Sequence, residues 1–239
     1  MPAPPVSSAP APEGAVTTLA VFDLDGTITR SDTLVGYLLG YLGRHPLRLW
    51  RLPMCLLPVL KFAAVKRDRG ELKSAVIRLT LGGLTRSELE RWNQIFIAKL
   101  LRGGVFAEAL EQISAQRSAG AHLVLLSASP DLYVPAIAAA LGFDEVICTQ
   151  LRWHADGRLH GALCSANRRG AEKVRCLQAL LQTHRPTRSC AYGNSPADLG
   201  HLQLVGAGTY VNGSPAALVN LPNVRAVRWS GHGSTTSAV

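Results

Sequence analysis

The sequence predicts an open α/β fold: a Rossmann-like, doubly wound parallel sheet with a small all-helical cap inserted after the first strand. Two patterns carry this prediction. Short runs that are apolar throughout end in polar turns, and they cover residues 18–22, 121–126, 189–192 and 208–211. Amphipathic stretches of helical period lie between these runs, over residues 106–118, 132–141 and 171–182. Strands buried on both faces of a parallel sheet are apolar throughout, and strand–helix alternation is typical of a doubly wound fold.

Each apolar run is followed by a polar segment that we expect at one edge of the sheet. The run TLAVF ends in DLDGT, the run AHLVLL ends in SASP, the third run ends in GNSPAD, and the fourth precedes NGSP. Ligands of open parallel sheets bind beyond the carboxyl ends of the strands. These polar segments therefore mark the expected site.

The interval between the first two strands, residues 29–104, is too long for a simple crossover, since a βαβ unit takes roughly 30 residues or more. Its pattern is helical over residues 31–42, 47–65, 71–79 and 85–101. Thr85 and Glu88 have the spacing of a capping box at the start of the last of these helices. We expect this insert to form the cap over the polar edge of the sheet.

The chain therefore divides into a core domain of residues 18–30 and 105–229 and a helical cap domain of residues 31–104. Residues 1–17 are rich in Pro, Ala and Ser and lack the basic and apolar regions of a signal peptide. They are predicted to be a disordered leader, and residues 230–239 a disordered tail.

The charge balance favours an anionic partner. Lys and Arg total 25 against 16 Asp and Glu, which gives a net charge of +9. This balance attracts phosphorylated substrates, acidic lipid surfaces or nucleic acid. We do not expect nucleic-acid binding, because aromatic residues are only 6% of the chain and no nucleic-acid-binding motif is present. The five cysteines form no C-x-x-C pair, which is typical of reduced cysteines in a cytoplasmic protein.

The stretch VFDLDGT carries the most chemical information. Chance D-x-D pairs are common, but this one follows a buried strand and is followed by Gly and Thr. It resembles the first signature of the haloacid dehalogenase superfamily. Three later segments are similar to the other signatures of that superfamily, in the same order: Ser127 after the second strand, Lys173 at a helix start, and the loop at residues 193–198. The resemblance extends from about Leu19 to Val211.

The resemblance implies a magnesium-dependent phosphomonoester hydrolase. Asp23 would attack phosphorus and form an aspartyl-phosphate, which splits one difficult displacement into two easier ones. Asp25 would protonate the leaving alcohol and then deprotonate the attacking water. Ion-pumping ATPases of the superfamily carry D-K-T-G-T and lack this second acid, so the presence of Asp25 favours fast hydrolysis.

The same resemblance implies how the site compensates charge, because a phosphate dianion repels a carboxylate nucleophile. Ser127 and Lys173 would bind the phosphoryl oxygens. Magnesium prefers oxygen ligands. The residues implied to hold it are Asp23, Asp25 through its backbone carbonyl, Asn194 and Asp198.

Asn194 departs from the family pattern, which reads G-D-S-x-x-D where this chain reads GNSPAD. An Asn carbonyl can ligate magnesium with one less negative charge. We favour an active enzyme with weaker metal affinity, in which Asp198 orients the metal's water or ligands from outside the first coordination sphere. The competing hypothesis, which stays open, is a catalytically weakened binding module.

The cap refines the resemblance. A helical cap after the first signature, together with SASPDLY and GAEKV, resembles subfamily IB, the phosphoserine-phosphatase-like branch. The cap opening, SDTLVGYLLGYLGRHPLRLW, looks similar to the bacterial phosphatidylglycerophosphatase C group. The apolar run that follows is too interrupted by Arg, Lys and Pro to span a bilayer. Arg44, Arg48 and Arg51 share a helical stripe beside Trp50, which is typical of a helix that lies at a membrane surface. A cap helix packed on its neighbours, with its basic face in water, explains the same pattern equally well.

Two substrate classes stay open. A phosphatase acting on a phospholipid head group, such as that of phosphatidylglycerophosphate, would contact an anionic membrane peripherally through the cap. A soluble phosphatase for a small metabolite such as phosphoserine would need an Arg for the carboxylate, and Arg78 is a candidate. The expected location is the cytoplasm, with peripheral contact at the inner membrane surface in the first case. Residues 149–163 predict a hairpin that turns at Asp156 and Gly157 and flanks the site.

Overall fold

The structure, a computed structural model, describes residues 16–64 and 68–230. The leader and the tail expected from the sequence therefore lie outside the described residues, except for residues 16, 17 and 230. The division into a core domain and a cap domain stays a prediction.

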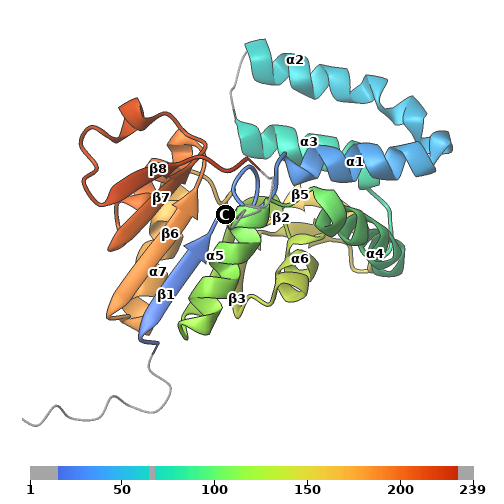
Figure 1. Ribbon diagram of the computed structural model, residues 1–239. Helices are drawn as coiled ribbons and strands as arrows, with labels where there is room; N and C mark the ends of the chain where they lie inside the picture. Colours follow the sequence, from blue (N-terminus) through green and yellow to red (C-terminus); the bar gives the residue numbers. More distant parts are fainter. Residues whose placement is uncertain (1–15, 65–67, 231–239) are drawn as a thin grey trace, which may run out of the picture.

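A six-stranded parallel sheet forms the centre of the molecule, with strand order β3-β2-β1-β6-β7-β8 (Figure 1). The strands are β1 Thr18–Phe22, β2 His122–Pro130, β3 Glu145–Thr149, β6 Arg188–Gly193, β7 Ala207–Val211 and β8 Val224–Val227. The chain runs outward from β1 to β3 on one side and from β6 to β8 on the other. The predicted fold class, a doubly wound parallel sheet, is confirmed, and its switch point lies at β1, where such sheets bind ligands.

The register brings three of the polar segments to one place. Phe22, the last residue of β1, pairs with Leu125 of β2 and with Tyr192 of β6. Two residues after Leu125 comes Ser127, and two residues after Tyr192 comes Asn194. The acidic turn that follows β1 therefore lies between the ends of its two neighbouring strands.

Both faces of the sheet are buried, which explains why its strands are apolar throughout. Ala20 and Phe22 of β1 pack in one core cluster with helices α5 Ala107–Ser118 and α6 Val134–Leu141. Leu19 and Val21 of the same strand pack in a second cluster with α7 Ala171–His184 and α8 Leu199–Leu202. Successive side chains of a strand point to opposite faces, so β1 contributes to both cores.

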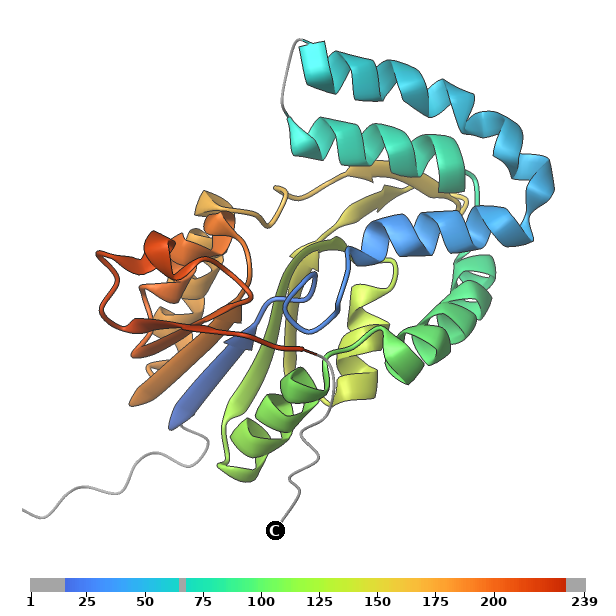
Figure 2. The same ribbon diagram turned by 45° about the horizontal axis from the view of Figure 1, so that its top comes forward.

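Four of the five described helices between β1 and β2 form the helical insert. They are α1 Thr33–Arg44, α2 Leu56–Ala64, α3 Arg69–Leu81 and α4 Arg86–Gly103, with 3-10 turns at Pro46–Arg51 and Pro53–Cys55. Helices α1, α2 and α3 lie beyond the carboxyl ends of the central strands (Figures 1 and 2). Side chains of Asp32 and Asp68 cap α1 and α3, and the predicted Thr85–Glu88 capping box at α4 is confirmed.

The predicted hairpin is confirmed as β4 Leu151–Trp153 and β5 Leu159–Leu163. It follows β3 in the chain, and its second strand packs on α3 (Figure 2). Gly161 has φ +85° there, and a Cβ at this position would lie 2.8 Å from the Arg78 Cα atom. Glycine is required at this contact both for its backbone angle and for its lack of a side chain.

Two strands and several boundaries differ from the sequence prediction. The helix expected over residues 47–65 begins as two 3-10 turns and becomes α-helical only at Leu56. The edge strands β3 and β8 were not predicted. Strand β2 extends through SASP to Pro130, and α6 begins only at Val134 with Tyr133 as its N-cap. Ser129 is thus a strand residue. Among the described helices, none is long and apolar enough to cross a membrane.

Candidate active site

The acidic turn begins at Asp23, directly after β1. The Asp23 N–H donates to the Tyr192 carbonyl at 3.0 Å, which continues the pairing with β6 into the turn. The turn closes where the N–H groups of residues 27–29 donate to the Leu24 carbonyl, and Gly26 supplies a φ of +79°. The Thr27 hydroxyl donates to Asp23 Oδ2 at 2.9 Å, so the buried carboxylate has a fixed orientation.

Lys173 joins two buried carboxylates. Its Nζ atom lies 2.6 Å from Asp23 Oδ1 and 2.7 Å from Asp198 Oδ1, and all three side chains are less than one-tenth exposed. Burial raises the pKa of Asp23 to about 6, even though Lys173 pulls it down. Burial also acts to raise the pKa of Asp198, but Lys173, His201 and Ser195 outweigh it and lower that pKa to about 2. Both carboxylates contact the same ammonium group, but Asp198 stays ionised to a lower pH than Asp23 does.

The loop after β6 contacts the acidic turn directly. Asp198 Oδ2 accepts hydrogen bonds from the Ser195 N–H at 2.9 Å and its hydroxyl at 2.6 Å, which fixes the loop. The Asn194 side chain lies so close to Gly26 that a Cβ there would be 2.0 Å from Asn194 Nδ2. The amide of Asn194 thus lies against the backbone of the D-x-D turn.

The Asp25 carboxylate accepts hydrogen bonds from helix α1 and from strand β2. Its Oδ1 atom accepts from the Thr33 N–H and hydroxyl, both at 2.6 Å, and its Oδ2 atom accepts from the Ser129 hydroxyl at 2.5 Å. Burial raises the pKa of the Asp25 carboxyl above its usual range against these hydrogen bonds. Sequence reasoning left Ser129 out of the site; the structure places its hydroxyl on Asp25.

Ser127 is fully buried at the position where the sequence places it, beside the acidic turn. Its Oγ atom accepts the Ser129 N–H at 3.0 Å. Among the described residues of this strand end, Ala128 and Ser129 line the cleft, whereas the buried Ser127 is not part of its lining.

A cleft of about 630 Å³ opens between the acidic turn and the helices above it. It is lined by five cationic side chains, namely Arg30, Arg69, Lys73, Arg169 and Lys173. Sequence reasoning singled out only Lys173. Arg69 and Lys73 lie one turn apart on α3 and so point from the same helix face, a spacing that the sequence displays.

Lys73 reaches from the helical insert to the sheet. Its Nζ atom donates to the Ala128 carbonyl at 2.5 Å and to Asn167 Oδ1 at 2.8 Å. Burial lowers the pKa of Lys73 to about 8, although Asp25 and Asp32 act to raise it. A lysine has three N–H donors. The described residues accept two of them, which leaves one for an anion in the cleft.

A second cavity of about 900 Å³ adjoins the cleft. Its lining comes mostly from α2, α3 and β5, and it shares Phe62, Leu72 and Asn167 with the cleft. Arg78, the candidate for a substrate carboxylate, lines this second cavity and not the cleft that contains Asp23 and Asp25.

The residues around Asp23 fit a magnesium ion. The donors that meet at the turn and the loop are carboxylate, amide and backbone oxygens, which are the ligands that magnesium prefers. Asp23 and Asp198 carry two negative charges when ionised, and Lys173 returns one positive charge, so the group stays negative and attracts a cation.

A family model described as haloacid dehalogenase-like hydrolase matches residues 20–203. The chain is also 32% identical over 201 residues to "Protein CicA" from Caulobacter vibrioides, covering 83% of this chain and 88% of that protein.

Two solved structures are similar in fold. One, a Bordetella pertussis protein of unknown function, has 23% identity and a TM-score of 0.70 over 84% of this chain and 92% of that one. The other, described as a phospho-aspartyl intermediate analogue of phosphoserine phosphatase, has 18% identity and a TM-score of 0.59 over 83% and 88%. At these identities the likeness shows the fold.

Proposed function

Since the chain belongs to the haloacid dehalogenase-like hydrolase family, we propose that it is a magnesium-dependent phosphatase that forms an aspartyl-phosphate at Asp23. The observation that carries this proposal is the buried group of Asp23, Lys173 and Asp198 beside Asp25, at the carboxyl edge of the sheet. The fold is also that of a phosphoserine phosphatase whose description names a phospho-aspartyl intermediate analogue.

The reaction runs in two displacements. An Asp23 oxygen attacks phosphorus, the bond from phosphorus to the substrate oxygen breaks, and Asp25 gives its proton to the leaving alcohol. Asp25 then takes a proton from a water molecule that attacks the aspartyl-phosphate, which releases inorganic phosphate and restores Asp23. The raised pKa of Asp25 supports this role, because a carboxyl group must be protonated to act first as an acid. Thr33 and Ser129 position it.

Positive charge at the site lowers the cost of bringing a phosphate dianion to a carboxylate. Lys173 is close enough to Asp23 to contact the phosphoryl oxygens, and the Ser127 hydroxyl can donate to them if it turns toward the cleft. Magnesium, when bound, would supply further positive charge at the phosphoryl group. The residues proposed to hold it are Asp23, Asp25 through its carbonyl, Asn194 and Asp198.

Phosphate release by the purified protein tests this function. We expect turnover of p-nitrophenyl phosphate that requires magnesium and is lost in Asp23→Asn, which keeps the shape of the side chain but removes the nucleophile. The matched control is Asp156→Asn in the exposed hairpin turn, which should keep full activity. Absence of turnover by the folded wild-type protein across a panel of phosphate monoesters would favour a binding module instead, an alternative that we do not favour.

We further propose that the substrate is an amphiphilic phosphate monoester, such as a phospholipid head-group phosphate. This finer proposal also assigns the chain to subfamily IB, with a cap like that of the phosphatidylglycerophosphatase C group. One support is the second cavity, which adjoins the cleft and is lined by Met54, Leu57, Pro58 and Phe62 on one side. An acyl chain would fit there while its phosphate lies beside Asp23.

A second support is the outer surface of the same segment. Leu47, Trp50 and Leu56 are 89%, 65% and 59% exposed, and Arg48 and Arg51 lie among them in the sequence. An apolar surface bordered by cations matches the interface of an anionic bilayer. A small metabolite such as phosphoserine would need neither this surface nor the second cavity.

Vesicles that contain phosphatidylglycerophosphate separate the two substrate classes. The double variant Leu47→Glu/Trp50→Glu should lose most activity on these vesicles but keep activity on p-nitrophenyl phosphate. Val219→Glu is the matched control, because Val219 is 83% exposed at a distant turn. Preference for phosphoserine over the vesicle substrate, or equal vesicle activity of the double variant, would refute the amphiphilic substrate and leave the phosphatase proposal intact.

A further inference from the structure

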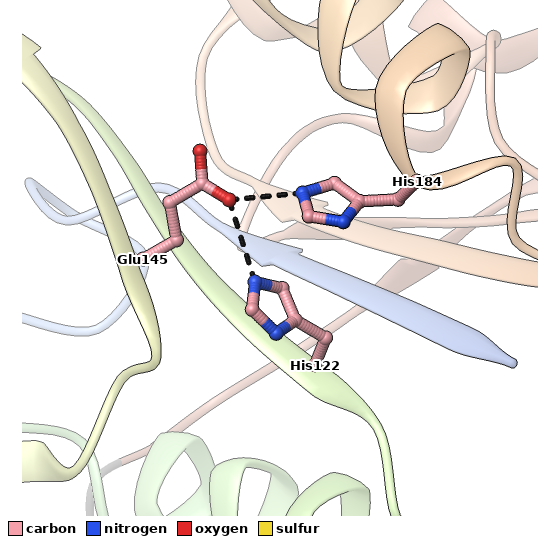
Figure 3. Close-up of side chains that lie close together, drawn as sticks. All are labelled: His122, Glu145 and His184. Atoms are coloured by element: carbon pink, nitrogen blue, oxygen red, sulfur yellow. Dashed lines mark hydrogen bonds and ion pairs between the residues drawn. The ribbon is translucent and has the colours of Figure 1, made fainter. Parts of the chain in front are cut away.

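Three side chains with metal-binding atoms meet at the edge of the sheet opposite to the active site (Figure 3). His122 is the first residue of β2, Glu145 is the first residue of β3, and His184 is the last residue of α7. Ser127 comes five positions after His122 along the extended strand, which is roughly 16 Å. The group therefore lies apart from the candidate active site, and the proposed phosphatase reaction does not use it.

Both imidazole rings point at one carboxylate oxygen. Glu145 Oε2 lies 3.3 Å from His122 Nε2 and 3.0 Å from His184 Nε2, and Figure 3 shows the two rings approaching it from different elements. The three ligand atoms lie within 4.8 Å of one another. In a tetrahedral zinc site with bonds of about 2.1 Å, ligand atoms are about 3.4 Å apart. Two of the separations already match, and a small rotation of an imidazole ring would bring in the third.

We propose that His122, Glu145 and His184 bind a transition-metal dication of the zinc type. Two imidazoles with one carboxylate is a donor set that zinc accepts and magnesium does not favour, because magnesium prefers oxygen ligands. The cation replaces the hydrogens that the two rings share with Glu145, and it joins the starts of β2 and β3 to the end of α7.

The surroundings of the group support a metal site. On the other side of the His122 ring, Nδ1 lies 3.9 Å from Asp144 Oδ2. Asp144 Oδ2 accepts the Leu123 N–H at 2.8 Å. A small movement of the His122 ring would let the same carboxylate accept the Nδ1 hydrogen, as is usual for histidine ligands. Glu145 and His184 also line a cavity of about 410 Å³, which gives the ion a path and leaves room for a water as the fourth ligand.

The sequence did not indicate this site, because its ligands are separated by 23 and 39 residues and follow no metal-binding spacing. Only the pairing of β2 with β3, and the return of α7 along the sheet, bring them together.

Zinc binding to the full-length protein tests the site. The protein is titrated with Zn²⁺ against a chromophoric chelator in millimolar magnesium, so that magnesium competes for the active site. We expect one tightly bound Zn²⁺ per chain. His184→Gln and Glu145→Gln should weaken its binding by about 100-fold or more, and Asp144→Asn by about tenfold. A change of less than tenfold in both ligand variants would overturn the proposal.

The matched control is His160→Asn. His154 and His160 are a second imidazole pair, with ring centroids 4.9 Å apart against 4.8 Å for His122 and His184. Removal of His160 should leave zinc affinity unchanged, and an equal loss there would also overturn the site. X-ray absorption of the wild-type protein gives a reading that does not depend on variant folding. Nitrogen and oxygen neighbours at about 2.0–2.1 Å are expected, whereas sulfur at about 2.3 Å would assign the zinc to cysteine.

Discussion

Asn194 puts a neutral amide where the family pattern has a carboxylate, and the fold presses this amide against Gly26. Asp has the same shape as Asn, so the exchange fits the space and changes only the charge. Because affinity for a hard cation rises with ligand charge, Asn194→Asp should lower the magnesium concentration for half-maximal activity by roughly tenfold. It should also lower the melting temperature in chelator, where a fourth carboxylate is added to Asp23, Asp25 and Asp198 without a cation.

The control for this exchange is Asn220→Asp, which adds the same charge at an exposed turn. It should change neither magnesium dependence nor stability in chelator. If Asn194→Asp left the magnesium dependence as it was, Asn194 would not be a metal ligand.

The ionisation of Lys73 should make kcat/KM depend on pH, because Lys73 lines the cleft. Burial lowers its pKa to about 8, so it is charged below that pH and neutral above it. If its third N–H binds the anionic substrate, kcat/KM should fall as pH rises through about 8, while the second ionisation of the phosphate, near pH 6, is already complete. Lys73→Arg keeps a charge at all these pH values and should move the alkaline fall upward. The measurement is kcat/KM against pH from about 6 to 10.

Lys99→Arg is the matched control for this profile, since Lys99 is exposed on α4. If kcat/KM fell at the same alkaline pH in the wild type and in Lys73→Arg, Lys73 would not bind the substrate and would only connect α3 to the sheet. That structural role would still appear as lower stability in Lys73→Met, because the Ala128 carbonyl and Asn167 would lose their donor.

At the scale of elements, the contact between β5 and α3 depends on a single glycine. Gly161 combines a φ of +85° with a position 2.8 Å from the Arg78 backbone. Gly157, in the turn of the same hairpin, has a φ of +77°, and a Cβ at this position would have no atom within 4 Å. Gly157→Ala should therefore cost only the backbone strain, about 1–2 kcal/mol. Gly161→Ala adds the clash and should cost about 1–3 kcal/mol more.

Chemical denaturation of both variants measures this difference. Equal losses of stability would mean that β5 shifts away from α3 at little cost, and that the close approach is not needed. A larger loss for Gly161→Ala would show that the hairpin and α3 depend on each other.

The elements that the sequence predicts are those with local signals. Strand β1 has an unbroken apolar run, the hairpin has its Asp-Gly turn, and α4 has its capping box. The edge strands lack such signals: β3, with sequence EVICT, is half-exposed along most of its length, and β8 has only four residues. An edge strand is stabilised by one neighbour, so its identity depends on tertiary pairing more than on its own pattern.

The residues of the candidate site also divide into those that stand in local motifs and those that only tertiary contacts bring to the site. Asp23, Asp25, Lys173 and Asp198 stand in motifs, and all four line one cleft. Ser129 and Lys73 could not be assigned to the site from the sequence. Ser129 reaches Asp25 because β2 runs past its predicted end, and Lys73 reaches the sheet only through the packing of α3. Contacts between segments far apart in the chain have no signature in a single sequence.

For the whole molecule, the packing argues against independent unfolding of the helical insert. Tyr37 and Trp92 of the insert belong to the same core cluster as Phe22 of β1 and Tyr133, which precedes α6. The Tyr37 ring lies 4.6 Å from that of Tyr133, and Thr33 of α1 donates to Asp25. The hairpin, which is encoded after β3, packs on α3. Separate unfolding of the insert would expose this shared core to water, so we expect the described part of the chain to unfold in one cooperative transition.

Tryptophan fluorescence can follow the two regions separately. Trp92 is buried in the insert, and Trp229 packs against Phe106 and Tyr192 beside the sheet. Two variants, each keeping one of these tryptophans with the other three replaced by Phe, should give the same urea midpoint as far-ultraviolet circular dichroism of the same variant. A Trp92 midpoint below that of the circular dichroism, with Trp229 unchanged, would mean that the insert unfolds first. The shared core would then stabilise the sheet less than its burial suggests, and the predicted cap would be a separate folding unit.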